Sequence, residues 1–297
     1  PSFKFDGLSK MDWSHAEDVW AYGYWKYLWA ADYLKVKNID AANGKVNLAK
    51  LSGYGLAPNM PFYFYNLLEA IDQPGEWFLD RKAKKIYLCP DKPIQQAKLE
   101  LSIFKQNFLK VKNAHHLVIH GLTFDCGQGT GVVMENVHDV RFSANTLSRL
   151  AGDGLEATNV SNMEIYGNDF FCLGRGGMKL SGGDRKTLTA GNINVENNWV
   201  RDFSRIDRPY TPAVLMDGVG NRIAHNLFHD APHHAIRLEG NDHIIEYNDV
   251  HSVVYESDDQ SGIDMWYNPS YQGNIMRYNF WHHIGSGHTG GGREGLR

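Results

Sequence analysis

A short pattern occurs seven times in the second half of the chain, and its spacing constrains the fold more than any other feature. Each copy runs from an aliphatic or aromatic residue through two mostly polar or small residues to a fixed ladder position, one variable residue and a large apolar residue. The ladder positions are Leu122, Asn145, Asn168, Asn198, Asn226, Asn248 and Asn279. A repeat of about 22–23 residues with occasional insertions indicates a solenoid with one coil per repeat. A buried asparagine at one turn bonds its copy in the next coil, about 4.8 Å away. We therefore predict an all-β chain built on a right-handed parallel β-helix.

The composition restricts the partners that such a chain can have. The net charge is −4 and the sequence contains no run of 18 apolar residues, so we expect neither a nucleic acid nor a membrane as partner. Aromatic residues make up 12% of the chain and glycines number 30, a composition more typical of extracellular carbohydrate proteins than of cytosolic enzymes. We therefore expect a secreted or periplasmic location.

The three cysteines are expected to stay reduced and buried. Cys126 and Cys172 both lie four residues after a ladder position but are two coils apart. That separation is roughly 9–10 Å, which is too far for a disulfide. Three cysteines cannot all pair, and Cys89 is expected to be reduced as well.

Residues 1–105 do not follow the repeat and are predicted to form a small β-rich accessory domain, followed by the β-helix at 106–297. Four tryptophans crowd its start, in a segment expected to contain short helical turns: Trp13, Trp20, Trp25 and Trp29. We interpret this segment as a domain core, with an exposed platform for sugars as the alternative. Alternating residues around Asn43-Gly44 predict one hairpin over 34–48, and 76–79 and 85–88 predict a second.

A second strand follows each ladder position, and its alternation defines an outward face. The strands are predicted at 132–135, 155–158, 178–181, 214–217, 236–239 and 263–266, with the second and fourth residue of each pointing outward. Two insertions, 202–212 and 252–261, leave the coils at the same corner. We expect them to form two walls beside this face, where a solenoid binds an extended ligand.

Carboxylates on this face are the candidate catalytic groups. Asp217 and Glu239 occupy the same outward position on adjacent coils, about 5 Å apart. Two carboxyl groups that close titrate as a pair and supply the acid and the base of glycoside hydrolysis. Asp258 and Asp259, in the second wall, are the alternative partners of Asp217 across a wider gap.

The remaining candidates are expected to contact substrate. The alternative interpretation of the acids is that Glu239 and Asp264 form surface ion pairs with Arg237. The spacing of the three nearby histidines resembles that of metal ligands, but we favour contacts to substrate and predict no metal site. Trp266 is expected to stack on a sugar ring or to pack beneath the second wall. The candidate substrate-binding residues are His229, His233, His234, Arg237, Asp264, Trp266 and Lys179.

Three stretches resemble the bacterial β-helix proteins of glycoside hydrolase family 141. They are YFYNLLE at 63–69 with PGEWFLDR at 74–81, TPAVLMDGVGNRIAHN at 211–226, and DAPH at 230–233. The resemblance implies a β domain joined to a β-helix and activity of the α-L-fucosidase or xylanase type on plant cell-wall polysaccharides. It also implies catalytic aspartates on the helix face, which match Asp217 and the pair Asp258 and Asp259 by position.

Three functions remain open at this point. A glycoside hydrolase on a complex plant or algal polysaccharide needs no cofactor. A polysaccharide lyase would use Lys179 as base and Arg237 to neutralise a sugar carboxylate, with Ca²⁺ held by the aspartates. A binding or structural β-helix would have no catalysis. The chain starts at Pro1 and its last coil appears without a cap near Met276 and Phe280, so we expect the remainder of a longer chain or a second chain to cover that end.

Overall fold

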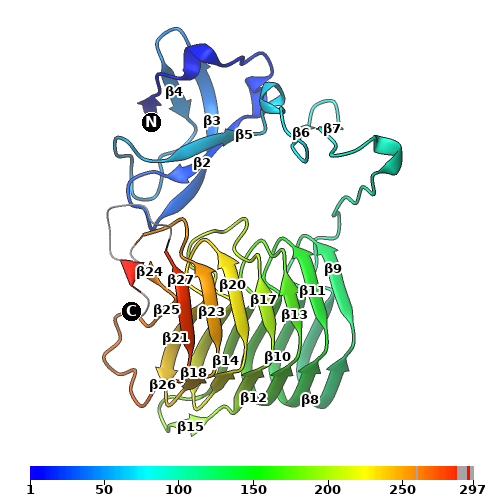
Figure 1. Cartoon of the computed structure of the whole chain (residues 1–297), viewed down its shortest axis with the longest axis vertical. Helices are drawn as coiled ribbons and strands as arrows, with labels where there is room; N and C mark the ends of the chain where they lie inside the picture. The colour runs from blue at the N-terminus through cyan, green and yellow to red at the C-terminus, as the bar shows by residue number, and fades with distance from the viewer. Residues whose placement is uncertain (259, 286–292, 295–297) are drawn as a thin grey trace. The chain divides into compact units, whose positions relative to one another are not determined.

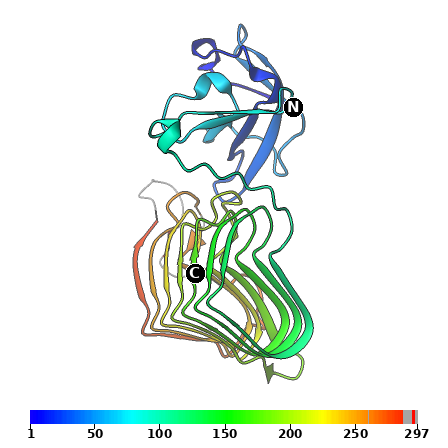
Figure 2. The ribbon, with the colours of Figure 1, turned by 90° about the vertical axis from the view of Figure 1, so that its right-hand side faces the viewer.

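The computed structural model describes residues 1–258 and 260–285, and the backbone of residues 293–294. The chain folds into two compact units, Pro1–Leu99 and Glu100–Arg297. The sequence places the change at about residue 105, because residues 1–105 do not follow the coil period. The structure instead includes the extended segment from Glu100 in the second unit. Figures 1 and 2 show both units.

The first unit is built on a five-stranded antiparallel sheet with the order β1-β4-β3-β2-β5. Its strands are β1 (Ser2–Lys4), β2 (Trp20–Tyr24), β3 (Ala31–Asp40), β4 (Lys45–Leu48) and β5 (Phe62–Tyr65). A separate hairpin pairs β6 (Trp77–Asp80) with β7 (Lys85–Leu88). Both predicted hairpins are therefore confirmed. Short 3-10 helices lie at Leu8–Lys10, Ala16–Asp18, Leu68–Ala70 and Ile94–Gln96.

The aromatic segment at the start of this unit divides between core and surface. Trp25 is 4% exposed and its indole N–H donates to the backbone oxygen of Asp32 at 2.9 Å. It packs with Leu8, Leu34 and other apolar residues in one core cluster, against which Trp13 also packs. The prediction of a core is thus right for these two tryptophans. The expected helical turns precede Val19, but Trp20–Tyr24 is a strand that pairs with β3 on one side and β5 on the other, and its residues are buried or half-buried.

The second unit is a right-handed parallel β-helix whose coils stack one behind another (Figure 2). Each coil has three faces. In the first coils one long strand covers two of them: β8 (Leu109–His120), β10 (Val132–Ser143) and β12 (Leu155–Tyr166). In later coils the first of these faces, here called the front face, is formed by β14 (Met178–Asp184), β18 (Val214–Val219), β21 (Ile236–Asn241) and β25 (Ile263–Asp264).

The second and third faces complete each coil. The second face continues as β16 (Ile193–Glu196), β19 (Arg222–Ala224), β22 (Ile244–Glu246) and β26 (Ile275–Arg277). The third face is β9 (Thr123–Gly127), β11 (Thr146–Leu150), β13 (Asp169–Phe171), β17 (Trp199–Arg201), β20 (Leu227–Ala231), β23 (Asp249–Val253) and β27 (Phe280–Ile284). Three two-residue strands lie outside these faces: β15 (Thr189–Ala190), β24 (Gln260–Ser261) and β28 (Arg293–Glu294).

The predicted register of the front face is confirmed. Parallel partners run from Val132 through Leu155, Met178, Val214 and Ile236 to Ile263. The last strand is shorter than predicted and ends at Asp264 rather than residue 266. Beyond it the chain enters a turn at Asn268–Tyr271, closed by the Tyr271 N–H to the Asn268 oxygen at 3.0 Å. Pro269 has no N–H for a sheet, so the strand does not resume within this turn.

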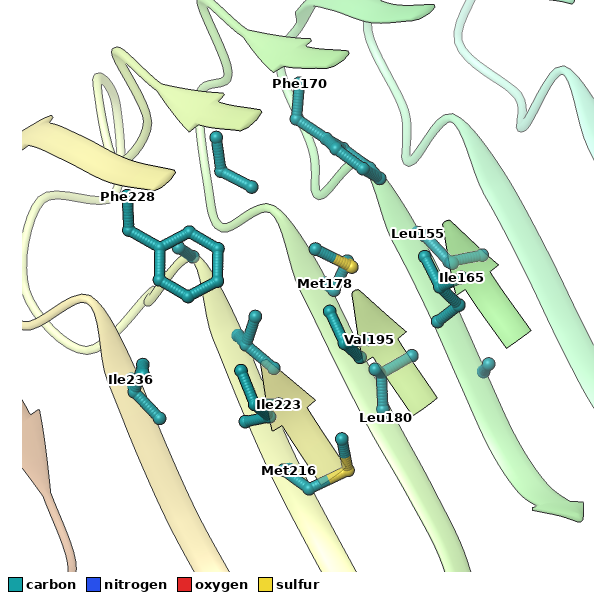
Figure 3. Packing of buried hydrophobic residues seen from close by; sticks show 14 of the residues in the cluster. Leu155, Ile165, Phe170, Met178, Leu180, Val195, Met216, Ile223, Phe228 and Ile236 are labelled. Carbon is teal, nitrogen blue, oxygen red and sulfur yellow. The ribbon is translucent and has the colours of Figure 1, made fainter. Parts of the chain in front are cut away.

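The interior is filled by the inward residues of all three faces (Figure 3). Met178, Val214 and Ile236 stack along one row of the front face, and Phe170 and Phe228 enter from the third face. All are at most 1% exposed. A dry, continuous core of this kind provides the main stabilisation of a solenoid, because each coil buries its neighbours' apolar side chains.

The asparagine ladder is also confirmed. Each amide nitrogen donates to the amide oxygen of the next ladder residue, at 3.1, 2.9, 3.0, 2.9 and 2.9 Å from Asn145 to Asn279. In the first copy, the backbone N–H of Leu122 donates to the Asn145 oxygen at 3.0 Å. The amides satisfy buried backbone carbonyls at the turn between the second and third faces, which a leucine cannot do.

Three smaller expectations have clear outcomes. Cys89, Cys126 and Cys172 are free thiols, as expected, but they are half-buried rather than buried. No helix in the described part of the chain has the length and apolar character required to cross a membrane. Met276 and Phe280 are 42% and 62% exposed, and most residues after 285 lie outside the described part, so covering of this end stays a prediction.

Candidate functional site

The front face presents two outward rows, as predicted from the alternation. Leu215 and Asp217 on β18 are half-buried and alternate with the buried Val214 and Met216. In the row of Leu215 lie Glu156, Lys179, Arg237 and Asp264, and in the row of Asp217 lie Ser181 and Glu239. The polar side chains of consecutive coils therefore meet across a single strand spacing.

Asp217 and Glu239 are direct partners in the register of β18 and β21. Each is followed by a glycine with positive φ, Gly218 at 109° and Gly240 at 115°. A Cβ at Gly240 would lie 2.0 Å from the Gly218 oxygen, so only glycine fits this close stacking of backbones. The tight turn also lets the Gly218 N–H donate to Asp217 Oδ1 at 2.7 Å. Local backbone geometry thus fixes where both carboxylates leave the strand.

Arg237 gives the two carboxylates different surroundings. Its Nε donates to Glu239 Oε1 at 2.8 Å and its Nη1 to Asp264 Oδ2 at 2.9 Å. The alternative prediction, that Glu239 and Asp264 form ion pairs with Arg237, is therefore correct. The pair with Asp264 is buried rather than solvated, because the Asp264 side chain is only 4% exposed. Among the residues that the structure describes, Asp217 has no cation within salt-bridge distance. One carboxylate of the pair is therefore neutralised by a guanidinium and the other is not.

The two insertions leave the same corner, as predicted, but they are tied together rather than standing as separate walls. Nε of Arg208 donates to both carboxylate oxygens of Glu256 at 2.7 Å. Gln260 Nε2 reaches the Tyr210 hydroxyl at 3.3 Å. Asp258 is 7% exposed within this assembly of loops. Asp259 lies outside the described residues.

His233 and His234 lie beneath these loops, which corrects the expectation that they face a groove. They are 1% and 0% exposed. Nδ1 of His233 accepts from the Tyr210 backbone N–H at 3.2 Å, and Nδ1 of His234 pairs with Gln260 Oε1 at 2.9 Å. Burial lowers the pKa of His234 to about 4 and that of His233 well below its usual range, because an imidazolium is poorly solvated there. Both rings are neutral near pH 7 and out of reach of a substrate.

His229 is placed elsewhere, on the third face. Its Nε2 accepts from the Trp199 indole N–H at 2.7 Å, and its Nδ1 pairs with Asp230 at 2.7 Å. Its ring stacks on His251 with centroids 4.7 Å apart, and His251 stacks on His282 at 4.8 Å. The three predicted histidines therefore do not form one cluster.

Two further candidates differ in their placement. Lys179 lies exposed on β14, opposite Glu156 and Leu215. Trp266 is 40% exposed and meets the edge of Tyr267 with centroids 4.5 Å apart. It lies beyond the end of β25, so it does not belong to the outward row of Asp217 as the sequence predicted.

The sequence did not single out a second pair of carboxyl groups beside the front face. Asp153 is buried, accepts from the Gly176 N–H at 2.7 Å and faces Arg175 Nε at 3.2 Å. Its pKa is raised, first by burial and also by the neighbouring Glu156 carboxyl, against the lowering effect of Arg175. Glu156 was visible in the outward row of the sequence. The burial of Asp153 in its glycine-flanked turn had no sequence signal.

A groove of about 620 Å³ runs along the corner after the third face, and we call it the corner groove. Its lining includes Asp202 and Asp230, which follow the paired residues Arg201 and His229 of adjacent coils, and Arg205. Both aspartates have positive φ, 50° and 58°. Their position in the repeat was the signal available in the sequence. Asp202 and Asp230 each come four residues after a ladder asparagine, and Cys126 and Cys172, which also line the groove, come four residues after their own ladder residues.

The part of the chain that the structure describes holds no group of three or more His, Cys, Asp or Glu residues arranged to bind a metal. The candidate chemistry of the front face is thus that of two neighbouring carboxylates, one of them held by an arginine.

Comparison with known proteins agrees with the fold. A family model described as a right handed beta helix region matches residues 103–204, within the second unit. One similar solved structure bears the name "Glycoside hydrolase"; it is 11% identical, with a TM-score of 0.42, over 96% of this chain and 72% of that one. No curated protein matches this sequence.

Proposed function

We propose that this chain is a glycoside hydrolase that acts on a complex plant or algal polysaccharide, with its chemistry on the front face. The observation that supports this is the register of Asp217 with Glu239 on adjacent coils. Stacked positions lie about 4.8 Å apart, close to the roughly 5–5.5 Å between the carboxyl groups of retaining glycosidases.

The surroundings of the two carboxylates assign their roles. Arg237 donates a hydrogen bond to Glu239, which we assign as the nucleophile. Asp217 has no such cation in the described part of the chain and acts as the proton donor, then as the base that activates water. Pairing Asp217 with Asp258 or Asp259 instead would give the wider spacing of an inverting enzyme.

A lyase is the second candidate, supported by the exposed Lys179 on the same face. The hydrolase is favoured because Arg237 is already engaged by Glu239 and Asp264, which leaves less of its charge for a sugar carboxylate. A lyase would also draw on Ca²⁺, whereas the proposed hydrolysis uses no cofactor. Its substrate is a polysaccharide met outside the cytoplasm, in keeping with a secreted or periplasmic enzyme.

The test is product analysis on xylan, pectin and fucoidan with the parent chain, Asp217→Asn and Glu239→Gln. A hydrolase releases new reducing ends, whereas a lyase produces unsaturated sugars that absorb in the ultraviolet. Both substitutions are expected to lower turnover by roughly 10²–10⁴. Glu164→Gln is the matched control, since Glu164 is an ion-paired carboxylate on the second face. Parent-like kinetics of Asp217→Asn would refute the assignment.

A further inference from the structure

Three aromatic rings gather on the surface of the first unit, apart from its core. The Tyr27 and Trp29 rings are parallel within 7°, with centroids 5.0 Å apart. Tyr54 stands nearly perpendicular to both, at 5.7 Å from Tyr27 and 4.9 Å from Trp29. None of the three belongs to the apolar core cluster of this unit. We call these three residues the ring cluster.

Two tight turns hold the ring cluster in place. The Ala30 N–H donates to the Tyr27 oxygen at 3.1 Å, and the Gly55 N–H donates to the Ser52 oxygen at 3.0 Å. Gly55, the last residue of the second turn, has a φ of 88°, a backbone conformation that a side chain would disfavour. The loops that carry the turns are joined by the Ala57 N–H to the Trp25 oxygen at 2.7 Å. The rings are thus positioned before any ligand arrives, which lowers the entropic cost of binding.

The ring cluster is exposed and bordered by groups that form hydrogen bonds. Tyr27 is 39% and Tyr54 is 54% exposed. Lys26 Nζ lies over the Tyr27 ring at 5.2 Å. Lys50, two residues after the end of β4, pairs with Asp32 on β3 at 3.7 Å. Apolar ring faces edged by hydroxyl, ammonium and carboxylate groups match a sugar ring, which has C–H bonds on its faces and hydroxyls at its edge.

The size of the ring cluster also favours a sugar over a protein partner. At the observed exposures, three aromatic side chains present on the order of 200–300 Å². A stable protein interface needs about 800 Å² from each partner, whereas one or two sugar rings require no more than this area. A cleft of about 880 Å³ in the same unit is lined by Trp25, Leu56 and Ala57 of the same two loops. A chain of sugars therefore has further surface to follow.

We propose that the ring cluster is a carbohydrate-binding site, separate from the carboxylates of the front face, that stacks on the neutral sugar rings of a polysaccharide. The site holds a polymer to the protein without taking part in bond cleavage. It goes beyond the proposed hydrolase, because the first unit would bind glycan even if the front face had no activity.

The test measures binding of the full chain to insoluble xylan, to pectin and to fucoidan by depletion from solution and affinity electrophoresis. Trp29→Ala and Tyr54→Ala are each expected to weaken retention on at least one glycan roughly tenfold, which corresponds to about 1.4 kcal/mol. Tyr54→Phe, which keeps the ring, is expected to retain most of the binding. Trp77→Ala is the matched control, because Trp77 is 60% exposed on β6 of the same unit and lies outside the ring cluster.

The outcomes separate this proposal from the hydrolase. Binding is recorded without turnover, so Asp217→Asn should bind like the parent chain whether or not the parent is an enzyme. The proposal is overturned if the parent binds none of the three glycans, or if Trp29→Ala and Trp77→Ala weaken binding equally. Light scattering that shows a dimer converted to monomer by Trp29→Ala would also overturn it, since the rings would then serve an interface between copies.

Discussion

The asparagine ladder gives the sharpest test of what holds the solenoid together, and Asn226→Leu is the substitution of choice. Asn226 is 2% exposed. Its amide nitrogen donates to the oxygens of Val195, Ala224 and Asn248, each at 2.9 Å. Its oxygen accepts from the backbone and side chain of Asn198 at 2.9 and 3.0 Å. Leucine has the same number of side-chain heavy atoms with the same branching and already occupies the ladder position at Leu122, so the change removes the hydrogen bonds. Its methyl groups are larger than the amide groups they replace, and the packing strain that this adds is shared by the control variant.

The magnitude follows from the groups that lose their partners. Each buried polar group left unsatisfied costs about 1–3 kcal/mol, and the groups that lose a partner here include the backbone N–H of Asn198 and the carbonyls of Val195 and Ala224. The side-chain nitrogen of Asn198 keeps its bonds to the Ile165 and Glu196 oxygens. Because bonds in one network do not add fully, we expect a total loss of about 3–5 kcal/mol. At about 2–4 °C per kcal/mol for a domain of this size, the melting temperature should fall by roughly 6–20 °C.

The assay is urea unfolding monitored by circular dichroism, with Asn279→Leu as the control at the last described rung. Asn279 accepts from the Asn248 backbone N–H and side chain at 3.0 and 2.9 Å and donates to Ile245 and Arg277. It bonds one ladder neighbour instead of two and lies partly open to solvent, so its loss should cost about half as much. A loss below about 1 kcal/mol for Asn226→Leu, or equal losses for the two variants, would show that apolar packing alone sets the register.

Two other predictions concern the loops and the buried histidines. The pKa of His234 is lowered to about 4 by burial, so the unfolded chain takes up a proton first as the pH falls. The contribution of His234 to stability is therefore full above about pH 6.5, and about 3 kcal/mol of it is lost as the pH approaches 4, in addition to the loss from His233, whose pKa is also lowered. His234→Gln should make the decline less steep, and an equally steep decline in the variant would contradict the assignment. Arg208→Ala removes the ion pair with Glu256 that joins the two insertions. Backbone amide exchange should then rise across 202–212 and 252–258 while global stability changes by only about 1 kcal/mol; exchange that stays at the parent level would mean that the hydrogen bond of Gln260 to Tyr210 suffices.

The parts of the structure that the sequence predicts are those fixed by backbone geometry. A coil must return to the same corner after each turn, so the spacing of Asn145, Asn168 and their copies predicts the ladder. Alternation along a strand then predicts which residues point outward, and the partnership of Asp217 with Glu239 follows. These relations depend on position in the repeat and on little else.

The parts that escape prediction depend on how the insertions fold onto the coils. The sequence places His233 and His234 in a turn, where exposure is the usual expectation. It contains no local signal that the loops carrying Tyr210 and Gln260 will cover the two histidines. The same holds for Asp153, whose burial depends on Arg175 and the Gly176 N–H of the next coil. Contacts between irregular segments do not recur at a fixed spacing, so the periodicity of the sequence does not predict them.

The difference in surroundings between Asp217 and Glu239 depends both on the regular repeat and on side-chain contacts that the repeat does not determine. The repeat makes the two positions equivalent, because each is the fourth residue of its strand and each precedes a glycine with positive φ. What distinguishes them is a side chain in the neighbouring outward row, Arg237, which bonds Glu239 on its own strand and Asp264 on the next. Asp264 in turn holds the guanidinium, since a buried carboxylate requires a counter-charge. Regular stacking thus brings two acids together, and one arginine anchored in the next coil gives them different partners, as our proposal of one proton donor and one nucleophile requires.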